Sequence, residues 1–139
     1  MKQLGKSISW LTAILLATTA ISCSSGGGGG DDPQPPSVDI SGTWSGVYTS
    51  DEAGGFVTFT LNQDGNTITG TYITSDGGAG NFHGTLSGDS LEWYLDLPDW
   101  CPGEISGTGT CSATTMTLDF DGYDCEDSYD NGSASLNKV

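Results

Sequence analysis

The feature that most constrains the fold is a series of short runs between Val38 and Val139 in which apolar and polar residues alternate. Clusters of Gly, Asn, Asp and Ser separate these runs, and none of them has the spacing of an amphipathic helix. Alternation places successive side chains on opposite faces of a strand, whereas a helix needs a period of about 3.6 residues. The region is therefore predicted to be all-β, with eight strands at 41–49, 55–62, 67–74, 81–87, 90–97, 104–111, 115–121 and 132–138.

A weak internal repeat indicates how these strands are arranged. The order apolar, polar, Gly, Thr recurs at 40–43, 68–71, 82–85 and 105–108, and each glycine falls on the apolar face of its strand. Glycine inside a strand marks a bend or a close backbone approach, and several of them suit a coiled sheet that closes on itself. We predict an eight-stranded antiparallel up-and-down barrel, with a two-sheet sandwich as the alternative.

The first third of this region resembles the calycins, the superfamily of lipocalins and avidins. Gly42-Thr43-Trp44 is similar to the Gly-x-Trp opener of their first strand, and Gly70-Thr71-Tyr72 is similar to the third strand of avidins. The resemblance implies an eight-stranded calycin-like barrel, and it would map two biotin contacts of avidins onto Tyr72 and Thr74. Gly46 stands where avidins place an Asn, so the resemblance implies the fold rather than biotin binding.

The interior of such a barrel is expected to be filled. A barrel of this size is just wide enough to be packed with side chains or to hold one small ligand. Short strands and many large inward residues favour packing over a cavity. The large residues expected to point inward are Trp44, Phe59, Tyr72, Phe82, Trp93 and Phe120.

The first 22 residues are predicted to be an export signal. Lys2 and Lys6 precede a mostly apolar run at 8–21, which is shorter than the roughly 20 residues of a membrane-spanning helix. The motif Ala20-Ile21-Ser22-Cys23 resembles the lipobox of bacterial lipoproteins. That resemblance implies cleavage before Cys23 and acylation of its thiol and its new amine. An ordinary secretory cleavage that leaves Cys23 as a free thiol is the alternative.

The sequence divides into 1–22 as lipoprotein signal peptide, 23–37 as lipidated Cys with a Gly- and Pro-rich tether, and 38–139 as the β-barrel domain. Glycines make a tether flexible and prolines stiffen it. Ser24 resembles the outer-membrane sorting position of Gram-negative lipoproteins. We therefore expect a protein held in the cell envelope, at the outer membrane, through its lipid.

The segment after Cys23 is strongly acidic. It carries all 18 Asp and Glu residues, with Lys138 as its only Lys or Arg, so its side-chain charge is near −17. Such a surface repels nucleic acid and anionic lipid headgroups, which excludes nucleic acid as a partner. It favours solubility and attracts cations.

Three cysteines remain in the barrel region, and the predicted topology pairs two of them. Alternate loops of a meander lie at opposite ends of a barrel, which places Cys101 and Cys125 together at the end with the longer loops. Cys111 ends a strand at the other end, beyond disulfide reach. A disulfide between Cys101 and Cys125 is predicted, with Cys111 buried. A separate hairpin at 101–111 would instead pair Cys101 with Cys111.

The longer loops, above all the one at 122–131, gather acids and aromatics. Weak Ca²⁺ binding is one hypothesis, because Ca²⁺ takes six to eight oxygen ligands, and a solvated acidic loop is the alternative. The candidate ligands are Asp119, Asp121, Asp124, Glu126, Asp127 and Asp130. Trp100, Tyr123 and Tyr129 could form a platform for a glycan or a protein, or could cover the barrel mouth.

No catalytic constellation is evident. His83 is the only histidine and is expected to face outward, and the chain has no arginine. The first hypothesis is a lipid-anchored binding module, favoured by a pocket bordered by Trp100 and Tyr123. The second is a structural or surface-coat lipoprotein with a sealed mouth and no small ligand. A hydrolase would need two carboxyl groups facing each other in a deep cleft. No cofactor is expected besides weak Ca²⁺.

Overall fold

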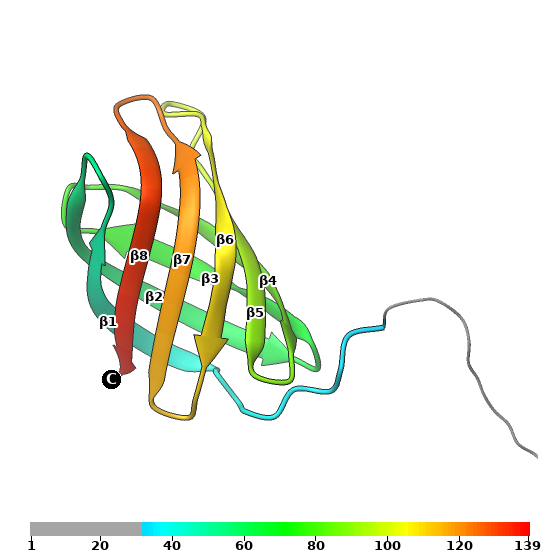
Figure 1. Cartoon of the computed structure of the whole chain (residues 1–139). Helices are drawn as coiled ribbons and strands as arrows, with labels where there is room; N and C mark the ends of the chain where they lie inside the picture. Colours follow the sequence, from blue (N-terminus) through cyan, green and yellow to red (C-terminus); the bar gives the residue numbers. More distant parts are fainter. Residues whose placement is uncertain (1–31) are drawn as a thin grey trace, which may run out of the picture. The chain divides into compact units, whose positions relative to one another are not determined.

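Figure 1 shows the computed structural model of the chain, which describes residues 32–139 and contains a closed barrel of eight antiparallel strands. Each strand pairs with its neighbours in sequence, and β1 pairs with β8 to close the barrel. The up-and-down barrel is thus confirmed and the sandwich is wrong. The strands are β1 (Gly42–Thr49), β2 (Gly54–Asp64), β3 (Thr67–Thr74), β4 (Ala79–Ser87), β5 (Ser90–Asp96), β6 (Glu104–Cys111), β7 (Thr115–Tyr123) and β8 (Ser128–Lys138).

This architecture is consistent with a calycin-like domain. The predicted signal peptide, the lipobox with Cys23 and most of the predicted tether lie outside the described residues. Residues 32–139 contain no helix with the length and apolarity needed to span a membrane.

The predicted open loop at 122–131 is wrong, because most of it belongs to strands. β7 runs on to Tyr123 and β8 begins at Ser128, which leaves only Asp124 to Asp127 as the turn. The register of the β7–β8 pair shifts at a bulge between Phe120 and Gly122. Near this bulge, the φ angle is 151° at Gly122 and 52° at Asn131. The Asp121 carboxylate accepts a hydrogen bond from the Asn131 backbone N–H at 3.0 Å, which holds the two strands together across this irregularity.

The chain before β1 closes the end of the barrel that carries the tight turns. Ile40 and Trp44 are fully buried there, and the Trp44 indole N–H donates to the Ile40 carbonyl at 2.8 Å. The Gln63 side chain accepts from the Ile40 N–H at 2.8 Å and donates to the Val38 carbonyl at 3.2 Å. Ser37 also donates its N–H to the Gly88 carbonyl at 2.8 Å, so the chain enters at the turn end, as expected.

The compact unit spans Pro33–Val139, so residues 33–37, which were assigned to the tether, belong with the barrel. The Gln34 N–H donates to the Ser87 hydroxyl at 2.8 Å, and its carbonyl accepts from the Asn66 side chain at 2.7 Å. This unit contains every strand and the whole hydrophobic core. A unit with its own core and a closed sheet is able to fold alone.

Aromatic rings fill the middle of the barrel. The Phe59 and Phe82 rings meet edge to face with centroids 5.1 Å apart, and Phe82 stacks on Trp93 at 5.6 Å. Phe120 meets Trp93 edge to face at 5.9 Å. The Trp93 N–H donates to the Thr108 carbonyl at 3.2 Å, which satisfies its polar group. Packing of this kind gives the strand walls a rigid interior support.

The strand glycines mark close backbone approaches, as the repeat predicted. A Cβ on Gly107 would lie 1.8 Å from the Asp119 carbonyl oxygen, and one on Gly70 would lie 2.1 Å from that of Thr60. Both distances are far below van der Waals contact. The sheet can therefore coil this tightly only where those positions have no side chain.

Candidate binding site at the barrel mouth

A cavity of about 140 Å³ opens at the end of the barrel opposite the tight turns. The β3–β4, β5–β6 and β7–β8 loops surround it, and Figure 1 shows β8, β7 and β6 reaching this end together at the top of the view. Its deeper lining includes Phe59, Trp93 and Phe120 of the aromatic interior. The expectation of a filled core is therefore confirmed in the middle of the barrel and wrong at the loop end.

The walls of the barrel extend above the aromatic layer at the loop end. β8 begins at Ser128, four residues earlier than predicted, and β7 runs on to Tyr123, two residues later than predicted. The inward positions of this upper part carry three tyrosines, Tyr48, Tyr72 and Tyr129, from β1, β3 and β8. Tyr48 and Tyr129 direct their hydroxyls to carboxylates of two different loops.

Two of these tyrosines form hydrogen bonds with carboxylates that also line the cavity. The Tyr129 hydroxyl donates to Asp124 Oδ2 at 2.8 Å, and the Tyr48 hydroxyl donates to Asp76 Oδ2 at 3.3 Å. Burial, together with the nearby Asp76 charge, raises the pKa of Tyr48 to about 12. Burial and the bond to Asp124 likewise raise the pKa of Tyr129. Both phenols are thus neutral donors at physiological pH.

Asp76 is held in place by the tight β3–β4 loop. The Thr74 hydroxyl donates to its Oδ1, and the Gly78 N–H donates to the same oxygen at 3.3 Å. These bonds, chiefly the one from Thr74, keep the pKa of Asp76 below its usual value. Asp76 therefore contributes a negative charge to the mouth at neutral pH.

Asp124 is held in a similar way by the β7–β8 loop. Its Oδ1 accepts from the backbone N–H groups of Glu126 and Asp127, both at 2.8 Å. This arrangement is an Asx turn, in which a short polar side chain replaces a backbone partner. Asp124 Oδ2 is left to face Tyr129 and the cavity.

The predicted disulfide between Cys101 and Cys125 is present, with Cα atoms 4.9 Å apart, and it joins the β5–β6 and β7–β8 loops. It thereby ties the loop that carries Trp100 to the loop that carries Asp124. Cys111 is buried and unpaired, as predicted, and burial raises the pKa of its thiol to about 12.

Tyr72 differs from the other two tyrosines of the cavity. Its side chain is only 4% exposed and lines the cavity, yet its hydroxyl makes no hydrogen bond to any residue of the described chain. Burial raises its pKa to about 12, with smaller contributions from Asp124, Asp96 and Asp76. Buried polar groups in native proteins nearly always have a partner, so the partner of this hydroxyl comes from outside residues 32–139, from water or from a ligand.

The predicted aromatic platform is only partly assembled. Trp100 and Tyr129 both line the cavity, but Tyr129 is buried whereas Trp100 is 71% exposed at the rim. Tyr123 lies outside the cavity on β7 and is 55% exposed. The pocket named as favouring a binding module, one bordered by Trp100 and Tyr123, is therefore found in part: Trp100 and Tyr129 line the cavity and Tyr123 does not.

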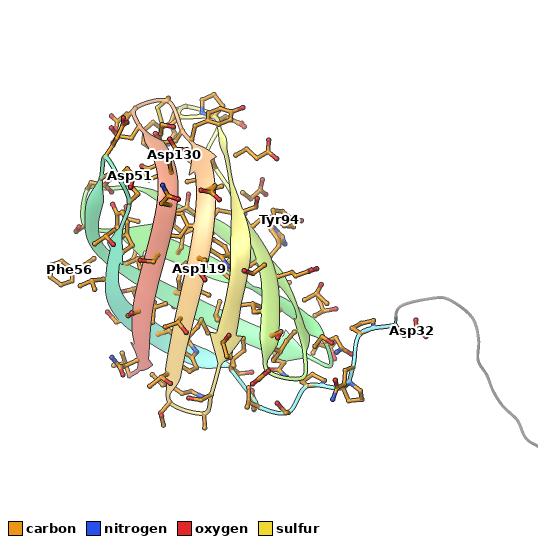
Figure 2. The ribbon with its side chains drawn as sticks, in the orientation of Figure 1. Asp32, Asp51, Phe56, Tyr94, Asp119 and Asp130 are labelled. Atoms are coloured by element: carbon orange, nitrogen blue, oxygen red, sulfur yellow. A yellow bond between two sulfur atoms is a disulfide. The ribbon has the colours of Figure 1, made fainter. Side chains whose placement is uncertain are left out.

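The candidate Ca²⁺ ligands are spread over two faces. Figure 2 shows Asp119 on the outside, midway along β7, whereas Asp51 and Asp130 lie near the loop end. Asp121 is bonded to Asn131, and only Asp124 and Glu126 of the proposed set line the cavity. Among residues 32–139, no three His, Cys, Asp or Glu side chains come together as metal ligands. Ca²⁺ binding stays a prediction, without an assembled ligand set.

His83 faces outward from β4. Its ring stacks on Tyr94 with centroids 4.9 Å apart, and its Nε2 lies 3.8 Å from Asp96 Oδ2. These contacts place it on the outer wall, whereas the cavity opens at the mouth.

The residues of the mouth that the sequence reasoning missed as a group are Tyr48, Tyr72 and Asp76. Inward alternation placed the tyrosines inside, but nothing in the pattern showed that they would meet the carboxylates of two different loops.

Comparisons with protein-family models, with curated proteins and with solved structures found no match for this chain.

Proposed function

We propose that this protein is a lipid-anchored binding module of the bacterial cell envelope, whose barrel mouth takes up a small ligand. The observation that carries the proposal is the cavity of about 140 Å³, lined by aromatic side chains and by a few polar residues. Ligand sites generally combine a mostly apolar lining with a small number of oriented polar groups. The disulfide and the capped loops preorganise this lining, which lowers the entropic cost of binding.

The position of the chain's entry supports the proposed anchor. Ser37 is bonded at the turn end, opposite the cavity, so a lipid on Cys23 would leave the mouth directed away from the membrane. Two or more acyl chains are sufficient for stable anchoring. The lipobox resemblance and Ser24 support the outer membrane of a Gram-negative cell as the location. The exposed Trp100 and Tyr123 remain candidates for contact with a glycan or a protein.

The anchor is tested by Cys23→Ala in the producing cell. We expect the wild type to incorporate labelled palmitate and to sediment with membranes, and the variant to lose both properties. Cys111→Ala serves as the control, because Cys111 is buried in the barrel and should leave both properties unchanged. Membrane association that survives Cys23→Ala would contradict the proposal.

The binding role is tested with residues 32–139 and a library of small compounds, read out by thermal denaturation. A ligand present at about 100 times its Kd adds roughly 2.7 kcal/mol to the free energy of unfolding, which shifts the midpoint by several degrees. Leu97→Trp should fill the cavity and abolish the shift, since Leu97 lines it. Val47→Trp, on the exposed outer face, should leave the shift intact. The proposal would be contradicted if no compound raised the thermal midpoint, or if Leu97→Trp left the ligand-induced shift of the midpoint unchanged.

A further inference from the structure

We infer that the ligand of the barrel mouth is a small organic cation, an amine attached to a body of about one aromatic ring. This inference rests on the proposed function and names the ligand class for the same cavity. The ring would enter the aromatic interior, and the ammonium group would lie between Asp76 and Asp124.

The charges at the mouth have one sign. The charged side chains that line the cavity are the carboxylates of Asp76, Asp124 and Glu126, and no Lys, Arg or His lines it within the described part of the chain. Lys138, the only Lys or Arg after Lys6, lies over the Trp44 ring at 5.6 Å from its centroid, at the turn end. A cleft with low-dielectric walls and charges of one sign concentrates ligands of the opposite sign. The mouth therefore attracts cations and repels carboxylates and phosphates.

Both carboxylates keep free acceptor capacity toward the cavity. Their Oδ1 atoms accept the bonds that hold the loops, whereas each Oδ2 accepts one tyrosine hydroxyl. A carboxylate oxygen has two lone pairs, so each Oδ2 can accept one further N–H donor. The mouth therefore holds two carboxylates that are fixed by their loops, each with an Oδ2 able to accept one further N–H donor.

The aromatic lining of the cavity also favours a cation. The faces of tyrosine and tryptophan rings attract positive charge, most strongly in a desolvated site. The cavity is lined by five such residues, Tyr48, Tyr72, Tyr129, Trp93 and Trp100. Aromatic side chains of this kind form the cages that recognise organic ammonium groups in other proteins. A hydrated inorganic ion gains little from these walls, because it would lose water without finding a set of oxygen ligands.

The Tyr72 hydroxyl supplies the second, independent observation. It is buried, it lies on the cavity wall, and it has no partner among residues 32–139. A phenol oxygen accepts hydrogen bonds, so an ammonium N–H can give this group the partner that the chain does not. Ligand binding would thus give the buried Tyr72 hydroxyl a fixed partner in place of water.

The volume sets the size of the ligand. A cavity of about 150 Å³ in another protein holds one benzene molecule, and the cavity here is about 140 Å³. One six-membered ring with a short alkylamine therefore fits, with the amine at the rim. Larger bodies such as fused tetracycles or long acyl chains do not.

The inference is tested with three probes that share one body: phenethylamine, phenethyl alcohol and phenylpropionate. Calorimetric titration into residues 32–139 should show the amine binding at least about tenfold more tightly than the alcohol, and the anion binding least. A tenfold ratio is the order expected for one hydrogen-bonded charge. Equal affinity for amine and alcohol would overturn the inference and leave the proposed small-ligand function standing. If none of the three probes binds and the compound library yields only neutral or anionic ligands, the inference of a cationic ligand is wrong. If neither the probes nor any library compound binds, the proposed small-ligand function is wrong as well.

Single substitutions test which carboxylates are responsible for the preference for the amine. Asp76→Asn and Asp124→Asn keep an oxygen for the loop bonds but remove the charge, and each should weaken amine binding about tenfold while leaving alcohol binding unchanged. Tyr72→Phe should weaken amine binding severalfold. Asp119→Asn is the matched control, because it removes the same charge from the outer face of β7. An equal loss in Asp119→Asn would overturn the proposed site, since it would show a general effect of net charge.

Discussion

The Tyr129 hydroxyl donates a hydrogen bond to Asp124 Oδ2 at 2.8 Å, and this contact joins the beginning of strand β8 to the loop that precedes it. Tyr129 is buried, whereas Asp124 is half-buried at the rim. The bond therefore links the inner wall of the barrel to the surface loop that the disulfide also holds. It makes the β7–β8 loop part of the rigid mouth.

Tyr129→Phe should lower the free energy of unfolding by about 1.5 kcal/mol, because it removes a hydrogen bond to a charged group and leaves the ring in place. Denaturant titration of residues 32–139 measures the change. Tyr123→Phe is the control and should stay within about 0.5 kcal/mol, since Tyr123 is exposed. Equal effects of the two substitutions would show that the bond to Asp124 adds no stability.

The barrel should lose stability in alkali. The pKa values of Tyr48 and Tyr72 are raised to about 12 in the folded protein from an ordinary value of 10.0, because burial disfavours the charged phenolate. The unfolded chain then releases these protons first, so stability is unaffected by these groups below pH 10 and falls as pH rises from 10 to 12.

Denaturation midpoints across this pH range, together with the ultraviolet absorbance of tyrosinate, check this expectation. Tyr72→Phe should make the decline shallower, because one late-titrating phenol is removed. A decline that is unchanged in Tyr72→Phe would contradict the assignment.

Reduction of the disulfide should destabilise the barrel by about 3.5 kcal/mol, the loop-closure value for a crosslink of this size. Cys101 and Cys125 are 24 residues apart, and a crosslink of that span restricts the unfolded chain strongly. Thermal midpoints with and without reductant should differ for the wild type and for Cys111→Ala. They should coincide for the double variant Cys101→Ser with Cys125→Ser. A reductant effect that persists in the double variant would be inconsistent with this pairing.

Gly107→Ala should cost about 3 kcal/mol or more. Its Cβ would meet the Asp119 carbonyl oxygen, a backbone atom, so β6 and β7 must move apart. Thr108→Ala, at the exposed position next to it, should change the free energy of unfolding by less than about 0.5 kcal/mol. Chemical denaturation compares the two, and a near-neutral Gly107→Ala would show that the sheet is less tightly coiled than described.

Thermal midpoints in Ca²⁺ and in EDTA distinguish weak Ca²⁺ binding from the alternative of a solvated acidic loop, for which the two midpoints of residues 32–139 should be the same. Asp121 is bonded to Asn131, Asp124 caps its own loop, and Asp119 stands apart on the outer face. The proposed ligands are therefore not convergent, and Ca²⁺ requires six to eight oxygens around one point. A rise in midpoint specific to Ca²⁺ over Mg²⁺ would refute this expectation and restore the acidic segment as a metal site.

The interior of the barrel could be predicted from the sequence because alternation is a local property. Phe59, Phe82 and Trp93 were placed inward from their positions within single runs, and all three are buried. The meander favoured the pairing of Cys101 with Cys125, because it puts alternate loops at the same end, and the structure excludes the alternative hairpin that would pair Cys101 with Cys111. The upper part of β7 and β8 could not be predicted, because a bulge such as that at Gly122 depends on the register of the partner strand.

The sequence by itself determined that the chain forms strands, which side chains face inward and that the surface is acidic, and it favoured Cys101 with Cys125 as the disulfide. Each of these follows from spacing along one segment or from the order of segments. Only the tertiary structure decided that Tyr48, Tyr72 and Tyr129 would meet Asp76 and Asp124 around an open cavity. These residues come from strands and loops far apart in the chain. Their meeting depends on the closure of β1 on β8 and on the pairing register, which no single run of sequence contains.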